Sequence, residues 1–213
     1  IKKFVDKTFR GIRVTYVIND RYRETNTGYS LMLAAKAIGT SEYVKFDADV
    51  VFDIKILRQV LDSDHENVLC IDRNIALEDE EVKVIANDQM QVLEIGKSVD
   101  PKRALGESIG IEKISAGTGA LLFTELSEMM ESRENLQAYY EAAYAQLVNK
   151  GTQFHALDIS GLDWTEIDTA KDFAAASLSS FRPERLRNPL HFDRLSAASS
   201  LSSVKPLRSR SPI

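Results

Sequence analysis

The chain has very little of several residues that mark particular classes of protein. Of its 213 residues, one is cysteine, three are histidine and one is tryptophan. A single cysteine excludes a disulfide framework within the chain, and Cys70 lies in an apolar stretch typical of a buried strand. The three histidines share no ligand spacing, which argues against a zinc site. No apolar run approaches the ~18 residues of a membrane span, so we expect a cytoplasmic protein with no membrane partner.

Acidic residues outnumber basic ones over most of the chain. The net charge of −5 argues against nonspecific nucleic-acid binding. Residues 181–213 hold seven Lys and Arg against two acidic residues, so the first 180 residues carry −10. The same stretch is rich in serine and has no periodicity, which predicts a flexible basic tail, with contact to RNA or an acidic surface as the alternative. We therefore expect a domain over residues 1–180 and a tail over 181–213.

Apolar periodicity alternates between strand and helix patterns across the expected domain. The expected strands are 12–18, 43–46, 67–71, 82–86, 91–95, 107–115 and 154–159. The expected helices are 27–38, one beginning at 54 with Asp53 as its N-cap, 119–130, 134–149, and one opening at 167–169 with a Thr169–Asp172 capping pattern. This order predicts an α/β fold: a mainly parallel sheet with helices on both faces and a small antiparallel hairpin inserted around Asn87.

Two acidic clusters lie about 120 residues apart in the chain. The first contains Asp47 and Asp49 and follows an apolar run, and the second contains Glu166 and Asp168 just before a helix. Ligands of α/β sheets bind outside the carboxyl ends of the strands, where we expect both clusters. Carboxylates are hard oxygen ligands of the kind that Mg²⁺ takes beside substrate phosphates. The two clusters together predict a divalent metal held from opposite sides of a site.

Seven short segments, in order, resemble the sugar-phosphate nucleotidyltransferase superfamily, and most nearly its phosphocholine cytidylyltransferase-like branch. The resemblance covers residues 11–178 and depends on their order, since each segment alone is a weak signal. The segments are Asn19–Tyr22, Thr25–Leu31, Asp47–Phe52, Glu94–Lys97, Gly106–Ile111, Tyr139–Glu141 and Trp164–Thr169. The resemblance implies a Rossmann-like fold of the GT-A type that nucleotide-diphospho-sugar transferases share.

The chain departs from the family pattern in two places. The glycine-rich G-x-G-x-R loop and the downstream Pro-Lys, which hold the nucleotide triphosphate in the family, have no counterpart here, and Ala48 replaces a glycine. Because the chain also begins at Ile1 without a methionine, we expect a fragment that lacks the first βα unit. The resemblance then implies weak nucleotide binding and poor catalysis by this polypeptide alone, and an exposed sheet edge where the first strand belongs.

The family reaction is the attack of a phosphomonoester oxygen on the α-phosphorus of a nucleoside triphosphate, with release of pyrophosphate. The resemblance implies transfer of CMP from CTP to phosphocholine or to a sugar or alditol phosphate, with Mg²⁺ as cofactor and a homodimer left open. It makes Asp49 a catalytic metal ligand, together with Glu166 and Asp168. Asp47 is expected to lie next to these ligands without binding the metal directly. The alternative readings are a loop-capping carboxylate for Asp49 and a helix N-cap for Asp168.

Five further residues are candidates for substrate contacts. The resemblance places Lys97 at the acceptor phosphate as a catalytic residue, and a solvated surface lysine is the alternative. Asn26 and Ser30 lie one helical turn apart and could both face a substrate. The alternative is that Asn26 is only an N-cap and Ser30 a neighbouring surface serine. Glu107 and Tyr140 would suit a cationic head such as choline, by charge and by cation–π attraction. Their alternatives are a strand-edge glutamate and a helix-packing tyrosine.

Two other functions compete with nucleotidyl transfer. Asp47-Ala48-Asp49 also matches the D-x-D motif of nucleotide-sugar glycosyltransferases, although the second acidic cluster counts against that interpretation. The absent triphosphate loop favours a non-catalytic domain that binds a partner or metabolite, whereas the metal carboxylates oppose it. The sequence does not distinguish the base or the acceptor, and it predicts no specific nucleic-acid partner.

Overall fold

The computed structural model describes residues 1–178. The expected basic tail, residues 181–213, lies outside the described residues. No helix within residues 1–178 is long and apolar enough to cross a bilayer.

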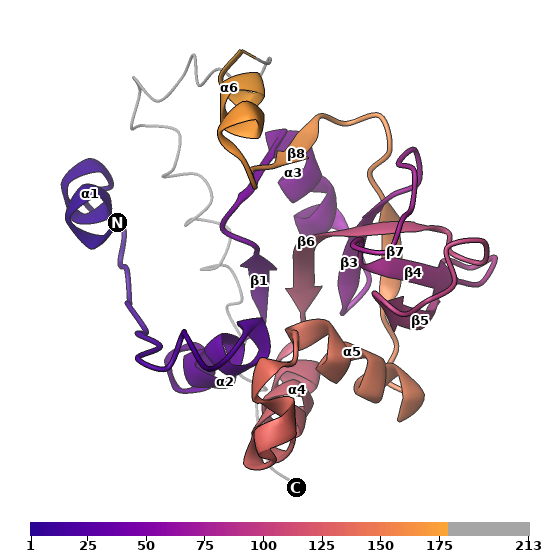
Figure 1. The fold of residues 1–213 in the computed structure, drawn as a ribbon, viewed down its shortest axis with the longest axis horizontal. Coiled ribbons are helices and arrows are strands. Elements are labelled where there is room, and N and C mark those ends of the chain that lie inside the picture. The colour runs from indigo at the N-terminus through magenta and orange to yellow at the C-terminus, as the bar shows by residue number, and fades with distance from the viewer. Residues whose placement is uncertain (179–213) are drawn as a thin grey trace, which may run out of the picture.

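A mixed six-stranded sheet forms the centre of the molecule (Figure 1). Its path runs β5-β4-β6-β3-β7, and β1 pairs with β6 beside this path. A separate two-stranded sheet joins β2 and β8. The strands are β1 (Tyr43–Phe46), β2 (Val50–Phe52), β3 (Val68–Asp72), β4 (Lys83–Ala86), β5 (Val92–Gly96), β6 (Gly106–Ile114), β7 (His155–Asp158) and β8 (Trp164–Glu166).

The α/β class is confirmed, but the strands pair differently from the expected mainly parallel sheet. Only β3 and β7 pair in parallel among the described strands, whereas β6 runs antiparallel to β1, β3 and β4. The expected hairpin is present as β4 and β5. After this hairpin the chain enters β6, the longest strand, which runs antiparallel to its neighbours. The alternation of strands and helices along the sequence does not predict this reversal of strand direction.

The helices cover the two faces of the sheet. One face carries α2 (Thr27–Ile38), α4 (Ala116–Glu131) and α5 (Tyr140–Asn149), which lie together in Figure 1, and the other carries α3 (Ile54–Asp62). The expected caps are observed, since the Asp53 side chain accepts a hydrogen bond from the Lys55 N–H (2.9 Å). Thr169 and Asp172 likewise exchange hydrogen bonds at the start of α6 (Ala170–Leu178).

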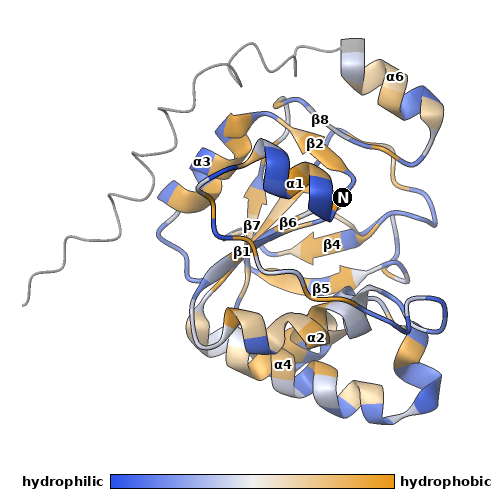
Figure 2. Cartoon of the chain, turned by 90° about the vertical axis from the view of Figure 1, so that its left-hand side faces the viewer, coloured by the Kyte–Doolittle hydropathy of each residue, from blue (hydrophilic) through white to orange (hydrophobic). Residues whose placement is uncertain are grey.

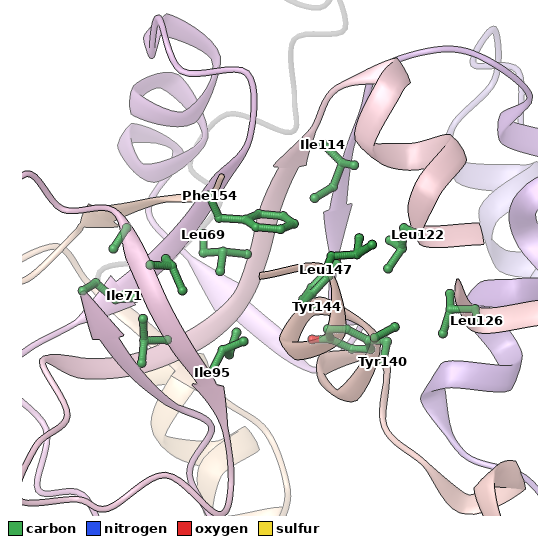
Figure 3. Packing of buried hydrophobic residues seen from close by; sticks show 14 of the residues in the cluster. Leu69, Ile71, Ile95, Ile114, Leu122, Leu126, Tyr140, Tyr144, Leu147 and Phe154 are labelled. Atoms are coloured by element: carbon green, nitrogen blue, oxygen red, sulfur yellow. The ribbon is translucent and has the colours of Figure 1, made fainter. Parts of the chain in front are cut away.

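Two apolar clusters hold these layers together. The larger lies between the sheet and α4 and α5, where Tyr140 and Tyr144 pack with Leu122, Leu147 and Phe154 (Figure 3). The smaller lies under α3. In Figure 2 the strands in the middle of the molecule are mostly hydrophobic, whereas the helices carry both hydrophobic and hydrophilic residues. Burial of this apolar surface is the main source of stability for the platform on which the acidic clusters sit.

Two expected elements differ in the structure. Residues 12–18 form no strand, because no described strand lies beside them to take their backbone hydrogen bonds, and Ile12 and Ile18 are exposed. The helix expected over 134–149 is divided into a 3₁₀ turn, η1 (Arg133–Gln137), and α5. The division follows from contacts with α2, because the Leu136 and Ala138 carbonyls accept hydrogen bonds from the Asn26 and Gly28 N–H groups.

The N-terminal helix α1 (Lys2–Thr8) stands apart from the layers in Figure 1. None of its residues is buried. The strand β1 that follows α2 pairs with β6 on one side, and no other described strand pairs with it. Among the described strands, β1 is therefore an edge strand, as are β5 and β7 at the two ends of the path.

Candidate active site

A two-stranded ribbon brings the two acidic clusters together. β2 begins immediately after Asp49 and pairs antiparallel with β8, in a register that sets Val50 opposite Glu166. One residue further on, the Ile167 N–H donates a hydrogen bond to the Asp49 carbonyl (3.0 Å). Antiparallel pairing places the start of one strand beside the end of the other. Two clusters separated by more than a hundred residues of sequence therefore meet at one end of the ribbon.

Asp49, Glu166 and Asp168 form a compact carboxylate triad. One carboxylate oxygen from each residue lies within 4.8 Å of the other two. Burial raises the pKa of Glu166, and the neighbouring charges of Asp168 and Asp49 raise it further. A bound cation would relieve the repulsion between these like charges. Three hard oxygen donors at this spacing fit Mg²⁺, which keeps water or phosphate oxygens in its remaining positions.

The triad lies in a pocket of about 780 Å³ between the ribbon, β1, β6 and the starts of α2 and α5. Seven carboxylates and two lysines line this pocket. The carboxylates are Asp47, Asp49, Glu80, Glu107, Glu141, Glu166 and Asp168. Both lysines are already paired, Lys45 with Asp47 and Lys97 with Glu80. The pocket is therefore strongly negative and suited to ligands that arrive with cations.

Lys97 and Glu107 both lie at the pocket. The Lys97 ammonium is 3.3 Å from a Glu80 oxygen and 4.9 Å from the centre of the Tyr139 ring. Its side chain is partly exposed, so it can turn toward an anion in the pocket. Glu107 belongs to β6, and burial raises its pKa to about 7, with further contributions from the charges of Glu81 and Glu166.

Asn26 and Ser30 have separate surroundings. The Asn26 side chain caps α2 by accepting a hydrogen bond from the Thr27 N–H (2.8 Å), and Asn26 does not line the pocket. Ser30 does line it, and its hydroxyl accepts a hydrogen bond from the Asn19 amide (3.0 Å). Ser30 therefore lies at the pocket. Asn26 is an N-cap of α2, which was the alternative interpretation of this residue.

Tyr140 is held in the floor of the pocket and is only 3% exposed. Its hydroxyl donates a hydrogen bond to Asp47 (2.7 Å), and its ring carries the Lys45 ammonium 3.5 Å from the centre. One face of the ring thus already binds a cation from the protein itself. The neighbouring Tyr139 ring, beside Lys97, is more open than that of Tyr140, because Tyr139 is 45% exposed.

Lys45 and Glu112 are site residues that we did not expect from the sequence. They are directly opposite each other on β1 and β6, and Lys45 lines the pocket while Glu112 is fully buried behind it. Burial raises the pKa of Glu112 to about 7 against the opposing effect of Lys45. The available signal was a charged residue in the middle of an apolar strand, with Tyr43, Lys45 and Asp47 alternating onto one face.

The two histidines within the described residues also come together, away from the triad. The His65 and His155 rings stack with centroids 3.6 Å apart and line a second pocket with several amide side chains. Burial and His65 lower the pKa of His155. Within residues 1–178 the carboxylate triad is the only group of three or more potential metal ligands at bridging distance.

Solved nucleotidyltransferase structures share this fold. The inositol-1-phosphate CTP transferase from T. maritima matches with a TM-score of 0.64 and 18% identity, covering 80% of this chain and 66% of that one. The CTP:phosphocholine cytidylyltransferase LicC from Streptococcus pneumoniae matches with 0.63 and 21%, covering 82% and 72%. A putative glucose-1-phosphate thymidylyltransferase from Bacillus anthracis matches with 0.62 and 16%, covering 82% and 68%. No protein-family model and no curated protein matches the chain.

The chain therefore has the fold of sugar-phosphate nucleotidyltransferases, as its sequence motifs predicted. It spans about two thirds of the first of these structures. At these identities the likeness establishes the fold.

Proposed function

We propose that this chain is a Mg²⁺-dependent nucleotidyltransferase that transfers CMP from CTP to a small phosphomonoester and releases pyrophosphate. Phosphocholine and sugar or alditol phosphates are the acceptor classes. The carboxylate triad carries the proposal, since two distant clusters converge on one point of a large pocket in a nucleotidyltransferase fold. We also expect the domain to end near residue 180 and the protein to act in the cytoplasm.

The reaction joins an acceptor phosphate oxygen to the α-phosphorus and breaks the bond from that phosphorus to pyrophosphate. Positioning and neutralisation of charge matter most for such a transfer. Asp49, Glu166 and Asp168 would hold Mg²⁺, which when bound neutralises charge on phosphate oxygens. Lys97 would leave Glu80 to pair with the acceptor phosphate, because an ammonium on a flexible stem reaches an anion by rotation alone.

The organic part of the acceptor would lie on the acidic side of the pocket. Glu107, Glu80 and Glu141 line that region, and Tyr139 supplies a partly open ring. Negative charge and an aromatic face favour an acceptor with a positively charged head over a neutral sugar. Phosphocholine is therefore our first choice of acceptor. Tyr140 would contribute to acceptor binding only indirectly, through its hydrogen bond to Asp47.

The glycosyltransferase alternative is less well supported by the geometry. In a D-x-D site both aspartates serve the metal and nucleotide, but here Asp47 is engaged by Lys45 and Tyr140 while Asp49 faces Glu166 and Asp168. A non-catalytic binding domain would have no need for a converging triad. These observations leave nucleotidyl transfer as the function that best accounts for the pocket.

The test is a transfer assay with radiolabelled CTP, MgCl₂ and a panel of phosphocholine, glucose 1-phosphate and inositol 1-phosphate. The label detects slow turnover, and a coupled assay measures pyrophosphate. We expect labelled product with phosphocholine and its loss by more than about a hundredfold in D49N, because the metal loses a charged ligand. The D49N/D168N double variant should be little worse than either single variant, because both act on one ion.

The matched control is D88N, which changes an exposed aspartate in the β4–β5 turn, far along the chain from the triad. It should keep wild-type turnover. Transfer of a sugar from a nucleotide sugar, with no pyrophosphate from CTP, would replace the proposal by the glycosyltransferase alternative. Turnover of D49N equal to that of wild type would remove the triad from the mechanism.

A further inference from the structure

Lys45 makes three close contacts with its ammonium group. The nitrogen lies 3.0 Å from an Asp47 oxygen, 3.0 Å from a Glu112 oxygen and 3.5 Å from the centre of the Tyr140 ring. The side chain is only 10% exposed. A buried ammonium is costly unless it is surrounded by such partners. Its position is therefore determined by β1, β6 and α5 together.

Asp47 is held just as firmly on its other sides. Its second carboxylate oxygen accepts the hydrogen bond from the Tyr140 hydroxyl, and its N–H donates to the Gly110 carbonyl (2.9 Å). The carboxylate packs so closely on Gly110 that a Cβ there would collide with it. The Asp47 side chain is therefore held by Lys45 and Tyr140 and packed against Gly110.

Asp49 follows two residues later, at the other end of the same short connection. Its carbonyl accepts the hydrogen bond from Ile167, so the connection from β1 to β2 is anchored at Asp47 and at Asp49. Ala48 is the single residue between them. The backbone on the β1 side of Asp49 is therefore held in place by Asp47 through one intervening residue.

We propose that Lys45 is a positioning residue, whose buried ammonium sets the Asp47–Asp49 connection and thereby aims Asp49 at the cation held by the triad. The inference deepens the proposed function and rests on its metal site. Lys45 itself contacts neither the triad nor, in this role, the substrate. Glu112 and Tyr140 contribute to the same positioning, because their contacts determine where the Lys45 ammonium lies.

The sign of the effect separates positioning from simple electrostatics. Lys45 lines the same pocket as the triad, so removal of its positive charge alone should strengthen the binding of a cation. Loss of positioning should weaken it instead, as changes behind metal ligands typically do, by about 10- to 100-fold. A variant that lacks the ammonium therefore decides between the two roles by the direction of the change.

The experiment measures Mn²⁺ binding to the full chain by the electron paramagnetic resonance signal of the free ion. K45M keeps the length of the side chain and removes the ammonium, and we expect its Kd for Mn²⁺ to rise by about tenfold or more. K113M is the matched control. Lys113 also lies on β6, but its ammonium donates to the Ser63 carbonyl and the residue does not line the pocket of the triad. It should bind Mn²⁺ as wild type does.

Two further variants protect the test against misfolding. K45A should bind Mn²⁺ weakly and recover on addition of propylammonium, which can restore the missing cation between Asp47 and Glu112, a recovery that a packing defect would not show. Y140F removes only the hydroxyl that holds Asp47 and should weaken binding by about threefold or more, as expected for loss of a hydrogen bond to a charged group. Melting temperatures establish that each variant is folded.

Folded K45M or Y140F that binds Mn²⁺ as tightly as wild type, or more tightly, would overturn the inference. D49N should lose the binding and so ties the signal to the triad. Wild type that binds no Mn²⁺ would overturn the metal site and this inference with it. Wild type that binds Mn²⁺ and depends on Lys45, but releases no pyrophosphate, would overturn only the proposed reaction.

Discussion

At the residue scale, the pocket depends on charged groups that the fold holds close together. Lys45 and Glu112 lie opposite each other on two paired strands, and Glu107, near the start of β6, lines the same pocket as Lys45. Each of these groups has been taken partly or wholly out of water. Their charges are therefore sensitive to neighbours, to pH and to small changes in the backbone.

Gly110 is a position where the backbone and the pocket both require glycine. Its φ is +72°, and an added Cβ would collide with Asp47, which Lys45 and Tyr140 prevent from moving aside. We expect G110A to lower the free energy of unfolding by at least about 2 kcal/mol. G117A, in α4, where an added Cβ meets nothing, is the control and should be neutral or slightly stabilising. Urea denaturation measures both, and equal stabilities would show that the connection is not tightly held.

Glu107 should make stability fall as the pH rises. Its pKa is raised from 4.5 to about 7 in the folded chain, so folding favours the protonated carboxyl and this stabilisation is lost between those values. E107Q cannot ionise and should be more stable than wild type at pH 8 by about 1–2 kcal/mol, a value reduced for the solvent-exposed part of the side chain. At pH 4.5 the two should be nearly equal. E134Q, at an exposed residue of η1, is the control, and a parallel pH dependence of wild type and E107Q would contradict the assignment.

At the element scale, the ribbon of β2 and β8 is the element that assembles the triad. It is separate from the central sheet, and its ends carry the Asp49–Ile167 and the Asp53–Asp163 backbone hydrogen bonds. The ribbon can therefore be disturbed while the large apolar cluster stays packed. Metal binding and global stability should respond differently to a change at this place.

I167P tests the ribbon directly. Proline removes the N–H that donates to the Asp49 carbonyl, so we expect Mn²⁺ affinity to fall by about tenfold or more while the melting temperature drops only slightly. A170P is the control, because Ala170 is the first residue of α6, where proline is tolerated. Titration with Mn²⁺ and thermal unfolding are the measurements. Unchanged affinity in I167P would show that the triad does not depend on this hydrogen bond.

At the scale of the whole molecule, the first 22 residues differ from the rest. None of α1 is buried, and large apolar side chains such as Phe4 and Ile18 are exposed. The layers from α2 onward share the apolar clusters, whereas this segment adds little to them. Local opening should therefore cost little free energy here and much more in the layers that contain the two apolar clusters.

Limited digestion with trypsin should reveal this difference. We expect early cleavage after Arg10 and Arg13, which are exposed and lie outside regular structure, with a product that retains the packed layers. Lys83 is the internal control, since it is 1% exposed and its ammonium is bound by backbone carbonyls. Mass spectrometry identifies the cuts. Cleavage after Lys83 at the same rate as after Arg13 would contradict the expected difference in local stability.

The sequence alone determined those features that depend on local chemistry. The helix over 27–38, the strand over 43–46, the hairpin around Asn87 and the Thr169 cap follow from periodicity, turn residues and capping side chains, all of which act over a few residues. The order of the motifs also indicated the fold, which the solved structures share. The acidic clusters were visible for the same reason, as each is contiguous in the chain.

The tertiary structure decided everything that joins distant segments. The antiparallel sense of β6, the absence of a strand over residues 12–18 and the ribbon that closes the triad depend on which backbone lies alongside, and local periodicity carries no such information. The same holds for Lys45, whose role appears only when Glu112 is opposite it and Tyr140 is above it. A strand pattern shows that a side chain faces the core, but only the packed neighbours determine what it meets there.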